Sequence, residues 1–407
     1  MRKLETILKL TLQVAFVIIF FSTIEAKNPD NLIKGKNISN YFSGILSLNS
    51  NQYGESYKYF NKLNNLEKDH FNFSKKYLFT LINLGKINEA FFFSKKLEKK
   101  KLNTFESDLI IGIYYFKNKK YNLAQEYFLK IKKEKKEILF NSFITESLLN
   151  WASFNNINFN LAKKRISSSE PAFDNLKRIQ NVFLHCYFDH KDTDFFFKKL
   201  INDKKIDFSR YNYFYASFLF DSGKIEEAQN VLNSSTKIFP RNLLLNQYKI
   251  DLSKKESFKP SFSCKNQSHV IAEILYITAN AFSAQSMFSF SNFYLNLAKY
   301  LNNDFQSFNT LLAENFYKIE DFEMSKKIYN QIKKKGSAYL WYAAKQNSNI
   351  LLKENKKEEA IELMSESFMK LTHKNLHDTF DFAEFLKRNK KYEIAIKYYT
   401  KIIESIN

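Results

Sequence analysis

The sequence predicts an all-α fold, a right-handed α-solenoid of stacked helix–turn–helix repeats. Three observations lead to this prediction. The 407 residues include only 7 Gly and 4 Pro, too few for the tight turns of a many-stranded sheet. The apolar fraction of 44% is that of a folded chain. The same sequence pattern also recurs with a period of 34 residues, in blocks that begin at Asn51, Gly85 and Lys119.

Each block is a short polar turn followed by an amphipathic helix, in which a small residue allows a close approach to the preceding helix. The small positions are Ser56, Ala90, Ala124, Ala162, Ala228, Ser325, Ala360 and Ala395. A bulky residue follows four positions later, as in Phe60, Phe128, Leu232, Tyr329, Met364 and Tyr399. The preceding helix has its own small residue, at Gly44, Gly112, Ala216, Ala279, Ala313 and Ala383. No single unit can bury its apolar face, so stability requires stacking.

This spacing divides the chain into a leader, two solenoids and a loop between them. Residues 27–252 are predicted to form an N-terminal solenoid, and residues 269–407 a C-terminal one, with an inserted loop at 253–268 around Pro260. The clear repeats are 37–70, 71–104, 105–138, 209–242, 272–305, 306–339, 341–374 and 376–407. The stretch 139–208 has blurred spacing and is predicted to contain degenerate helical pairs.

The period, the two small positions and the aromatic positions together resemble the tetratricopeptide repeat family. Ser94 and Lys357 depart from its pattern, since apolar residues are expected there. The second half, in Ala272 to Tyr276 and Tyr294 to Leu301, is similar to exported alphaproteobacterial repeat proteins. The resemblance implies a protein-interaction scaffold of the cell envelope. It also implies that the first helices of the repeats line a concave groove.

The N-terminus has the layout of a secretory signal peptide at residues 1–26. Basic residues precede an apolar stretch from Leu10 to Ile24, and a small residue, Ala26, stands before Lys27. This stretch of fifteen residues is shorter than the roughly 20 that a membrane span needs. We therefore expect export to the periplasm, with an uncleaved inner-membrane anchor as the alternative.

Cys186 and Cys264 are the two cysteines of the chain. They could pair in an oxidising compartment. Because Cys packs well as a small apolar side chain, we expect buried free thiols instead.

The net charge of +21 raises the question of a nucleic-acid or membrane partner. Only six of the 63 basic residues are Arg, the residue that best suits base and phosphate recognition. We therefore expect no nucleic-acid partner. A lysine-rich exterior that binds anionic lipid or a cell-wall polymer stays open as an alternative function.

No catalytic motif is present in the sequence. The seven glycines form neither a phosphate loop nor a dinucleotide fingerprint. On a continuous helix, His185 and His190 would point about 140° apart, so we expect no metal there. The sequence thus predicts no cofactor, no metal and no enzymatic activity, although a regulatory role in a larger enzyme complex stays open.

The groove positions implied by the resemblance form the candidate partner-binding site. They are Phe79, Phe116, Tyr213, Phe220, Tyr276, Asn280, Tyr317, Lys345 and Asn349. Aromatic anchors in a groove suit a protein or peptide ligand. Lys345 and Asn349 are similar to part of the family's clamp for a peptide carboxylate. Asp381 stands where another donor is expected, so we expect the clamp to be absent.

The last helix is apolar on more than one side, for example at Ile394, Ile396 and Ile403. We therefore expect either that the chain continues beyond residue 407 or that this end docks onto another molecule.

Overall fold

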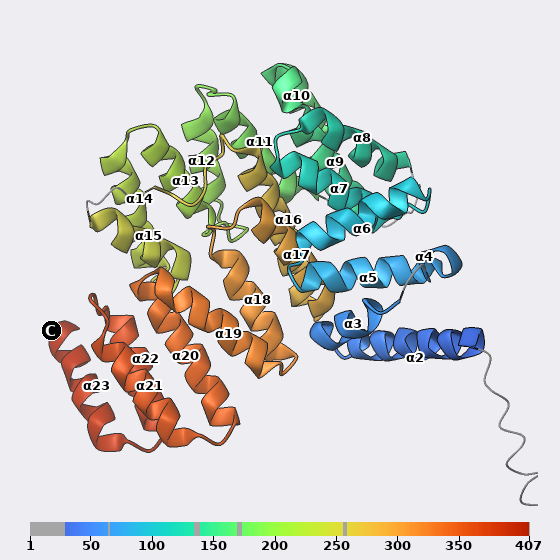
Figure 1. Cartoon of the computed structure of the whole chain (residues 1–407). Helices are drawn as coiled ribbons and strands as arrows, with labels where there is room; N and C mark the ends of the chain where they lie inside the picture. Colours follow the sequence, from blue (N-terminus) through green and yellow to red (C-terminus); the bar gives the residue numbers. More distant parts are fainter. Residues whose placement is uncertain (1–28, 64–65, 134–138, 169–172, 255–258, 407) are drawn as a thin grey trace, which may run out of the picture. The chain divides into compact units, whose positions relative to one another are not determined.

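The computed structural model describes residues 29–63, 66–133, 139–168, 173–254 and 259–406 (Figure 1). The regular structure of these residues is entirely helical, which confirms the predicted all-α solenoid. The predicted signal segment 1–26 lies outside the described residues. The chain divides into two compact units, Met1–Leu84 and Gly85–Asn407, and each is described by itself.

The described part of the first unit contains four helices. They are α2 (Pro29–Asn49), α3 (Tyr53–Phe60), α4 (Leu66–Asp69) and α5 (Phe71–Asn83). Gly44 of α2 packs against the ring of Phe60 so closely that an added methyl group would collide with it. The predicted contact between a small residue and a bulky one is therefore present in this unit.

The second unit continues the helix pairs along the chain. Its helices are α6 (Ile87–Lys99), α7 (Phe105–Lys117), α8 (Tyr121–Lys133), α9 (Leu139–Ser153), α10 (Phe159–Ser167), α11 (Asp174–Tyr187), α12 (Thr193–Ile201), α13 (Tyr211–Asp221), α14 (Ile225–Ile238), α15 (Leu243–Ser253), α16 (Gln267–Ala284), α17 (Phe288–Leu301), α18 (Ser307–Lys318), α19 (Phe322–Ile332), α20 (Ser337–Lys353), α21 (Lys357–Met369), α22 (Leu376–Arg388) and α23 (Tyr392–Ile406).

The small residues of the repeat lie where the paired helices touch. Gly112 of α7 faces the ring of Phe128 on α8, and a methyl group there would collide with it. Ala124, Ala228 and Ala360 are fully buried. Close packing at these positions holds each pair together, as the pattern predicts.

The blurred stretch 139–208 consists of two helix pairs, α9 with α10 and α11 with α12. Helices α10 and α12 are only nine residues long. The second helices α8, α10, α12 and α14 begin at Tyr121, Phe159, Thr193 and Ile225, so their spacings are 38, 34 and 32 residues and the 34-residue register is lost before α10 and after α12. The small residue Ala162 on α10 is nevertheless fully buried.

Helices far apart in the sequence meet within the second unit. Helix α16 packs against α9, where the side-chain amide of Gln267 donates to the carbonyl of Trp151 at 2.8 Å. Helix α17 packs against α7, where Lys117 Nζ donates to the carbonyl of Leu301 at 2.9 Å. The first helices α7 and α9 therefore contact the protein's own later helices.

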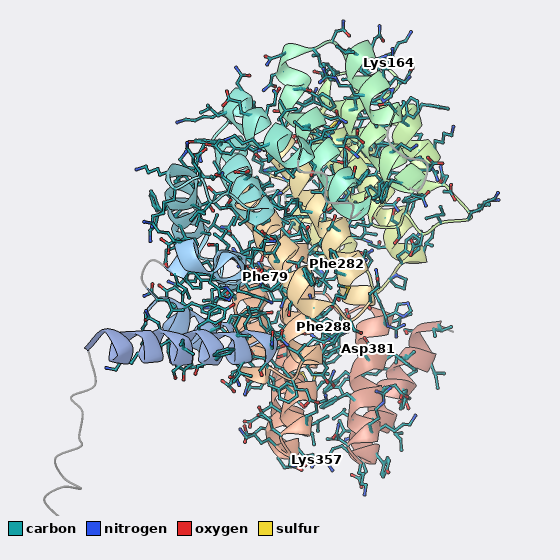
Figure 2. The ribbon with its side chains drawn as sticks, turned by 90° about the vertical axis from the view of Figure 1, so that its right-hand side faces the viewer. Phe79, Lys164, Phe282, Phe288, Lys357 and Asp381 are labelled. Carbon is teal, nitrogen blue, oxygen red and sulfur yellow. A yellow bond between two sulfur atoms is a disulfide. The ribbon has the colours of Figure 1, made fainter. Side chains whose placement is uncertain are left out.

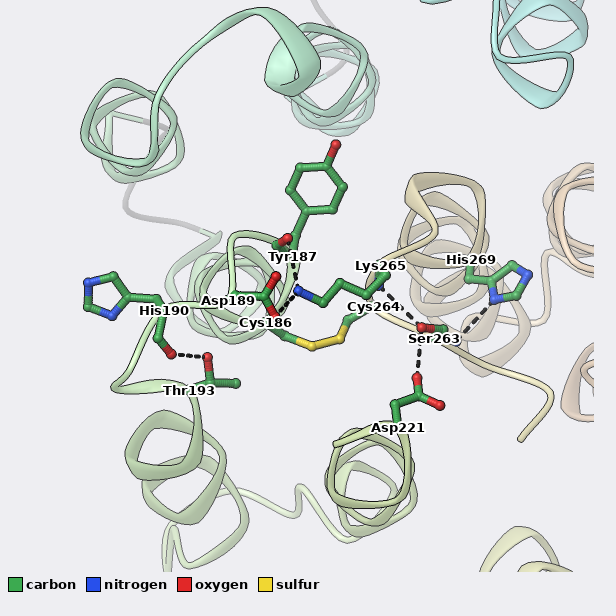
Figure 3. The surroundings of a disulfide bond; sticks show 10 residues. All are labelled: Cys186, Tyr187, Asp189, His190, Thr193, Asp221, Ser263, Cys264, Lys265 and His269. Carbon is green, nitrogen blue, oxygen red and sulfur yellow. Dashed lines mark hydrogen bonds and ion pairs between the residues drawn. A yellow bond between two sulfur atoms is a disulfide. The ribbon is translucent and has the colours of Figure 1, made fainter. Parts of the chain in front are cut away.

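The two cysteines are joined in a disulfide, so the expectation of free thiols was wrong (Figure 3). Cys186 lies on α11 and Cys264 lies in the inserted loop, with Cα atoms 6.0 Å apart. Next to the disulfide, Lys265 forms an ion pair with Asp189. Repeat spacing cannot reveal this contact, because it joins the loop to a helix that precedes it by 78 residues.

The described part of the inserted loop also packs into the interior of the second unit. The ring of Phe262 is buried and lies 4.4 Å from the ring of Phe214 on α13, centroid to centroid. The hydroxyl of Ser261 is 2.9 Å from the hydroxyl of Tyr213. The loop is thus part of the core between the preceding and following helices.

Helix α23 exposes several large apolar side chains. Ile394, Ile396 and Ile403 are all exposed, and Ala395 is buried against the neighbouring helices. These exposed positions agree with the apolar pattern noted in the sequence.

Candidate functional site

A cleft of about 420 Å³ lies between α14, α15, α20 and α22 of the second unit. Asp381 on α22, labelled in Figure 2, lines it. Its walls combine apolar side chains such as Ile250 and Trp341 with amides such as Asn246 and with charged groups. The volume lies within the range of about 300–1,000 Å³ that ligand pockets occupy.

The turn between α14 and α15 presents Arg241 to the cleft. Asn242 caps α15, because its side-chain oxygen accepts the N–H of Leu245 at 3.1 Å. The side-chain amide of Asn246 donates to the carbonyl of Pro240 at 2.8 Å. These two local hydrogen bonds fix the turn and therefore the point from which Arg241 extends.

Helix α15 is joined to the start of α20 by Gln247. The side-chain oxygen of Gln247 accepts the N–H of Ala338 at 3.0 Å. Gly336 precedes α20 with φ of 144°, a conformation that favours glycine. An added methyl group at Gly336 would also collide with the Gln247 side chain. This junction sets the spacing between the two walls that α15 and α20 contribute.

Trp341 forms part of the apolar floor and belongs to the core of the last repeats. Its ring lies 5.6 Å from Phe368 and 6.4 Å from Phe382, centroid to centroid. The side chain is buried, and within the described structure the indole N–H has no hydrogen-bond partner. One turn later on α20, Lys345 Nζ lies 5.6 Å from the centre of the Trp341 ring.

Asp381 forms ion pairs with two cations of the cleft. One carboxylate oxygen is 2.9 Å from an Arg241 nitrogen, and the other is 2.8 Å from Lys345 Nζ. Burial alone would raise the pKa of Asp381, but hydrogen bonds from Lys345 and Arg241 and their charges outweigh it. The pKa of Asp381 is therefore below its usual value, and the group is ionised at neutral pH.

Asp378 is the second carboxylate of the cleft and has a different environment. Its carboxylate accepts the N–H of Asn375 at 3.3 Å, while the Asn375 side chain accepts the N–H of Asp378 at 2.8 Å. This reciprocal cap fixes the start of α22. Burial raises the pKa of Asp378, in contrast to Asp381 on the same helix.

The structure gathers only one of the predicted groove residues, Lys345, into this cleft. Phe116 and Tyr213 are buried in the interior. The physical reason for Tyr213 is that the inserted loop and Phe305 cover it, with the two rings 5.4 Å apart. Tyr276 is half-buried, because the Arg210 guanidinium lies 4.0 Å from its ring centre.

The remaining predicted residues do not line the cleft. Phe79, on α5 of the first unit, is half-buried and labelled in Figure 2. Phe220 and Tyr317 are half-buried, and Lys353 Nζ lies 4.7 Å from the centre of the Tyr317 ring. Asn280 and Asn349 are exposed to solvent.

Sequence reasoning did not identify Arg241 as a site residue. It lies in the turn between two helices, at a position for which the repeat pattern has no defined role. Asp381 does stand out in the sequence, because it occupies a position in the first helix of the next repeat where the resemblance leads us to expect a donor. That departure does not reveal that Asp381 pairs with Arg241.

The geometry of His185 and His190 differs from the expectation. Helix α11 ends at Tyr187 and Asp189 adopts φ of 54°, so the chain folds back and the two rings lie 5.0 Å apart.

Across the described ranges, no group of three or more His, Cys, Asp or Glu side chains could hold a metal ion. In the same residues, no helix is both long and apolar enough to cross a membrane.

Comparisons with known proteins give structural likeness only. No protein-family model matches the chain, and no curated protein matches it in sequence. The structure of the P58(IPK) TPR domain is 14% identical, with 90% of this chain and 92% of that chain covered and a TM-score of 0.26. Human IFIT1, solved as a dimer with m7Gppp-AAAA, is 12% identical, with coverages of 91% and 90% and a TM-score of 0.25. Yeast Tom70 is 14% identical, with coverages of 91% and 84% and a TM-score of 0.28.

Proposed function

We propose that this protein is a non-catalytic protein-interaction scaffold of the bacterial cell envelope. It binds a protein or peptide segment in the cleft between α15, α20 and α22. One observation carries the proposal. The inner positions of α7, α9 and α13 are occupied by the protein's own helices and loop, while the cleft beside Lys345 stays open.

The chemistry of the cleft suits a peptide. An aromatic floor at Trp341 and Tyr342 offers apolar contact, and the surrounding amides and charges can orient a backbone and its side chains. The cleft includes Lys345 on the first helix α20, a position that the repeat resemblance assigns to partner binding. It has the dimensions of a few side chains, so it would hold a short segment of a larger partner.

Export is the second part of the proposal. The motivation is the signal-like segment 1–26 together with the disulfide, because disulfides persist in oxidising compartments. N-terminal sequencing of the native protein is expected to give Lys27 in a periplasmic fraction. An intact Met1 on protein from the cytosol would contradict export.

Site-specific photocrosslinking tests the partner site. A photoreactive residue placed at Lys249, which lines the cleft, is expected to give one discrete adduct in intact cells. The same residue at Glu126, an exposed position on α8, serves as the matched control. The adduct should disappear when Ile250→Trp fills the cleft. Equal adducts from both positions, or none from Lys249, would contradict the proposed site.

A further inference from the structure

Helix α2 exposes a row of apolar side chains. Ile38, Phe42 and Leu46, here called the α2 row, are 59%, 61% and 68% exposed. They recur every four residues and therefore lie on one face of the helix. The other side of α2 packs on α3, where Gly44 is buried. Residues 37–49 include no charged residue, although 26% of the whole chain is charged. An uncharged, apolar row at the surface marks an interaction site.

Helix α23 carries a similar row. Ile396 and Ile403 are 61% and 60% exposed, and Tyr399, which is half-buried, lies between them on the same face. These three residues are called the α23 row. The buried side of this helix, at Ala395, packs on α22. Neither row lines the cleft, so both lie outside the proposed partner site.

The chain itself shows what these repeat positions contact. Phe91 on α6 has the repeat position of Ile396, one residue after the small residue of the second helix. Tyr114 on α7 has that of Leu46, two residues after the small residue of the first helix. The rings of Phe91 and Tyr114 stack with their centroids 3.7 Å apart. A second helix therefore packs on the next first helix through these two positions.

Other members of the rows also have buried counterparts. Phe368 on α21 has the repeat position of Ile403, and it is buried and stacks on Phe382 of α22 at 4.4 Å, centroid to centroid. Ile110 on α7 has the position of Phe42 and is buried as well. The α2 row and the α23 row are therefore the two complementary halves of a repeat contact, and each half is exposed.

The two rows match in length when their helices run antiparallel. Phe91 lies near the start of α6 and Tyr114 near the end of α7, so the contact between these repeats is antiparallel. Along the helix axis, the α23 row spans about 10.5 Å and the α2 row about 12 Å, at 1.5 Å per residue. Placing Ile396 against Leu46 of a second copy therefore brings the opposite ends of the two rows together as well.

We propose that the α2 row of one copy of this chain docks on the α23 row of a second copy, so that the repeat packing continues from one molecule to the next. The contact is heterologous, because each copy contributes a different face. One helix face is a small interface, so we expect a dissociation constant on the order of 10–100 µM. Because each copy carries a net charge of +21, added salt should strengthen the contact by screening repulsion.

Sedimentation velocity of the purified chain at about 1–200 µM tests the proposal. The variants are Phe42→Lys in the α2 row and Ile403→Lys in the α23 row. Phe195→Lys is the matched control, because it places the same charge at a ring on α12 that is 60% exposed. The wild type and Phe195→Lys should associate as concentration rises. Docking would bury the new charge of each row variant without a partner, so each should associate at least about tenfold more weakly.

Mixing the two row variants tests the orientation of the contact. Phe42→Lys keeps an intact α23 row, and Ile403→Lys keeps an intact α2 row. An equal mixture should therefore form a 1:1 complex and nothing larger, although neither variant associates alone. Self-association of Phe42→Lys alone would mean that two α23 rows meet, and self-association of Ile403→Lys alone that two α2 rows meet. Either result would overturn the proposed pairing.

Three further outcomes would also overturn the proposal. A wild type that stays monomeric up to about 200 µM at physiological salt would exclude a second copy as the occupant. Equal association of all four proteins would place the contact on another surface. Cosedimentation of a monomeric wild type with phosphatidylethanolamine and phosphatidylglycerol vesicles, lost in Phe42→Lys, would make lipid the occupant of the α2 row. If circular dichroism shows that a row variant does not fold, Leu46→Lys or Ile396→Lys replaces it in the same row.

Discussion

Arg210 and Glu273 form a bidentate ion pair inside the second unit, across 63 residues of sequence. Nε and one terminal nitrogen of the guanidinium each lie 2.8 Å from a different carboxylate oxygen. Glu273 on α16 is fully buried, and the third guanidinium nitrogen donates to the Ser307 hydroxyl at 3.2 Å. The pair therefore links the segment before α13 to α16 and α18.

Removing one partner of this pair should destabilise the second unit strongly. Glu273→Gln leaves the Arg210 charge without its counter-ion among aromatic rings, so the free energy of unfolding should fall by about 3–5 kcal/mol. Urea denaturation followed by circular dichroism measures this loss. The double variant Arg210→Met/Glu273→Leu should recover most of it. Lys370→Gln, in an exposed pair with Glu366, is the control and should leave the midpoint unchanged. A double variant as unstable as Glu273→Gln would contradict this account.

Reduction of the disulfide should also lower stability. The Cys186–Cys264 bond closes a loop with a sequence separation of 78, for which the chain-entropy relation gives about 4.5 kcal/mol. Urea midpoints with and without a thiol reductant provide the measurement. The double variant Cys186→Ala/Cys264→Ala should be insensitive to reductant. Two free thiols in the native, unreduced protein would show that the bond does not form.

His269 should make stability depend on pH between about 4 and 6.5. The pKa of His269 is lowered from 6.5 to about 4. Burial is the main cause, and the positive charge of Lys117 is the second. The unfolded state therefore binds more protons in this window, and stability is full above pH 6.5 and falls as pH decreases towards 4. The loss should not exceed about 3.4 kcal/mol.

The comparison with His269→Gln isolates this contribution. In the native protein, the ring nitrogen Nδ1 accepts the N–H of Ser263 at 3.1 Å, a bond that protonation of Nδ1 would break. Unfolding free energies of both proteins across the window should converge as the pH falls. A constant difference at every pH would show that His269 does not titrate in this way.

Gly336→Ala should weaken the junction that forms the cleft. The φ of 144° disfavours an L side chain, and the added methyl group would meet Gln247. We expect a loss of about 1–3 kcal/mol in unfolding free energy, together with weaker peptide binding. Gly54→Ala is the control, because nothing lies within 4 Å of its added carbon. Unchanged stability in Gly336→Ala would indicate that the junction relaxes freely.

The lysine-rich surface should bind nucleic acid and anionic vesicles only weakly. Exposed charges are screened beyond about 8 Å at physiological ionic strength, so any binding should fall steeply with salt. Fluorescence anisotropy with mixed DNA sequences and cosedimentation with anionic vesicles measure this. Tight, sequence-dependent binding at physiological salt would restore the nucleic-acid hypothesis.

The sequence predicts the helix pairs well, because their contacts are local and periodic. Gly112 and Phe128 illustrate this, since their spacing within one repeat already indicates that they touch. The pairing of Arg210 with Glu273 has no such signal, and neither does the contact of Lys117 with Leu301. Nothing in a 34-residue period specifies which distant helices meet. For the same reason, the groove residue Tyr213 could not be distinguished from a core residue.

The contact between α7 and α17 has a consequence for synthesis of the chain. Lys117 and Leu301 are 184 residues apart, so their contact forms only after α17 has left the ribosome. Until then, the surfaces of α7, α9 and α13 that later contact α16, α17 and the loop are open, including Tyr213. Ordinary repeat arrays fold by adding neighbours one at a time, but this one needs a late, non-local closure, which slows folding. These surfaces therefore stay exposed on the nascent chain during the interval between the synthesis of α13 and that of α17.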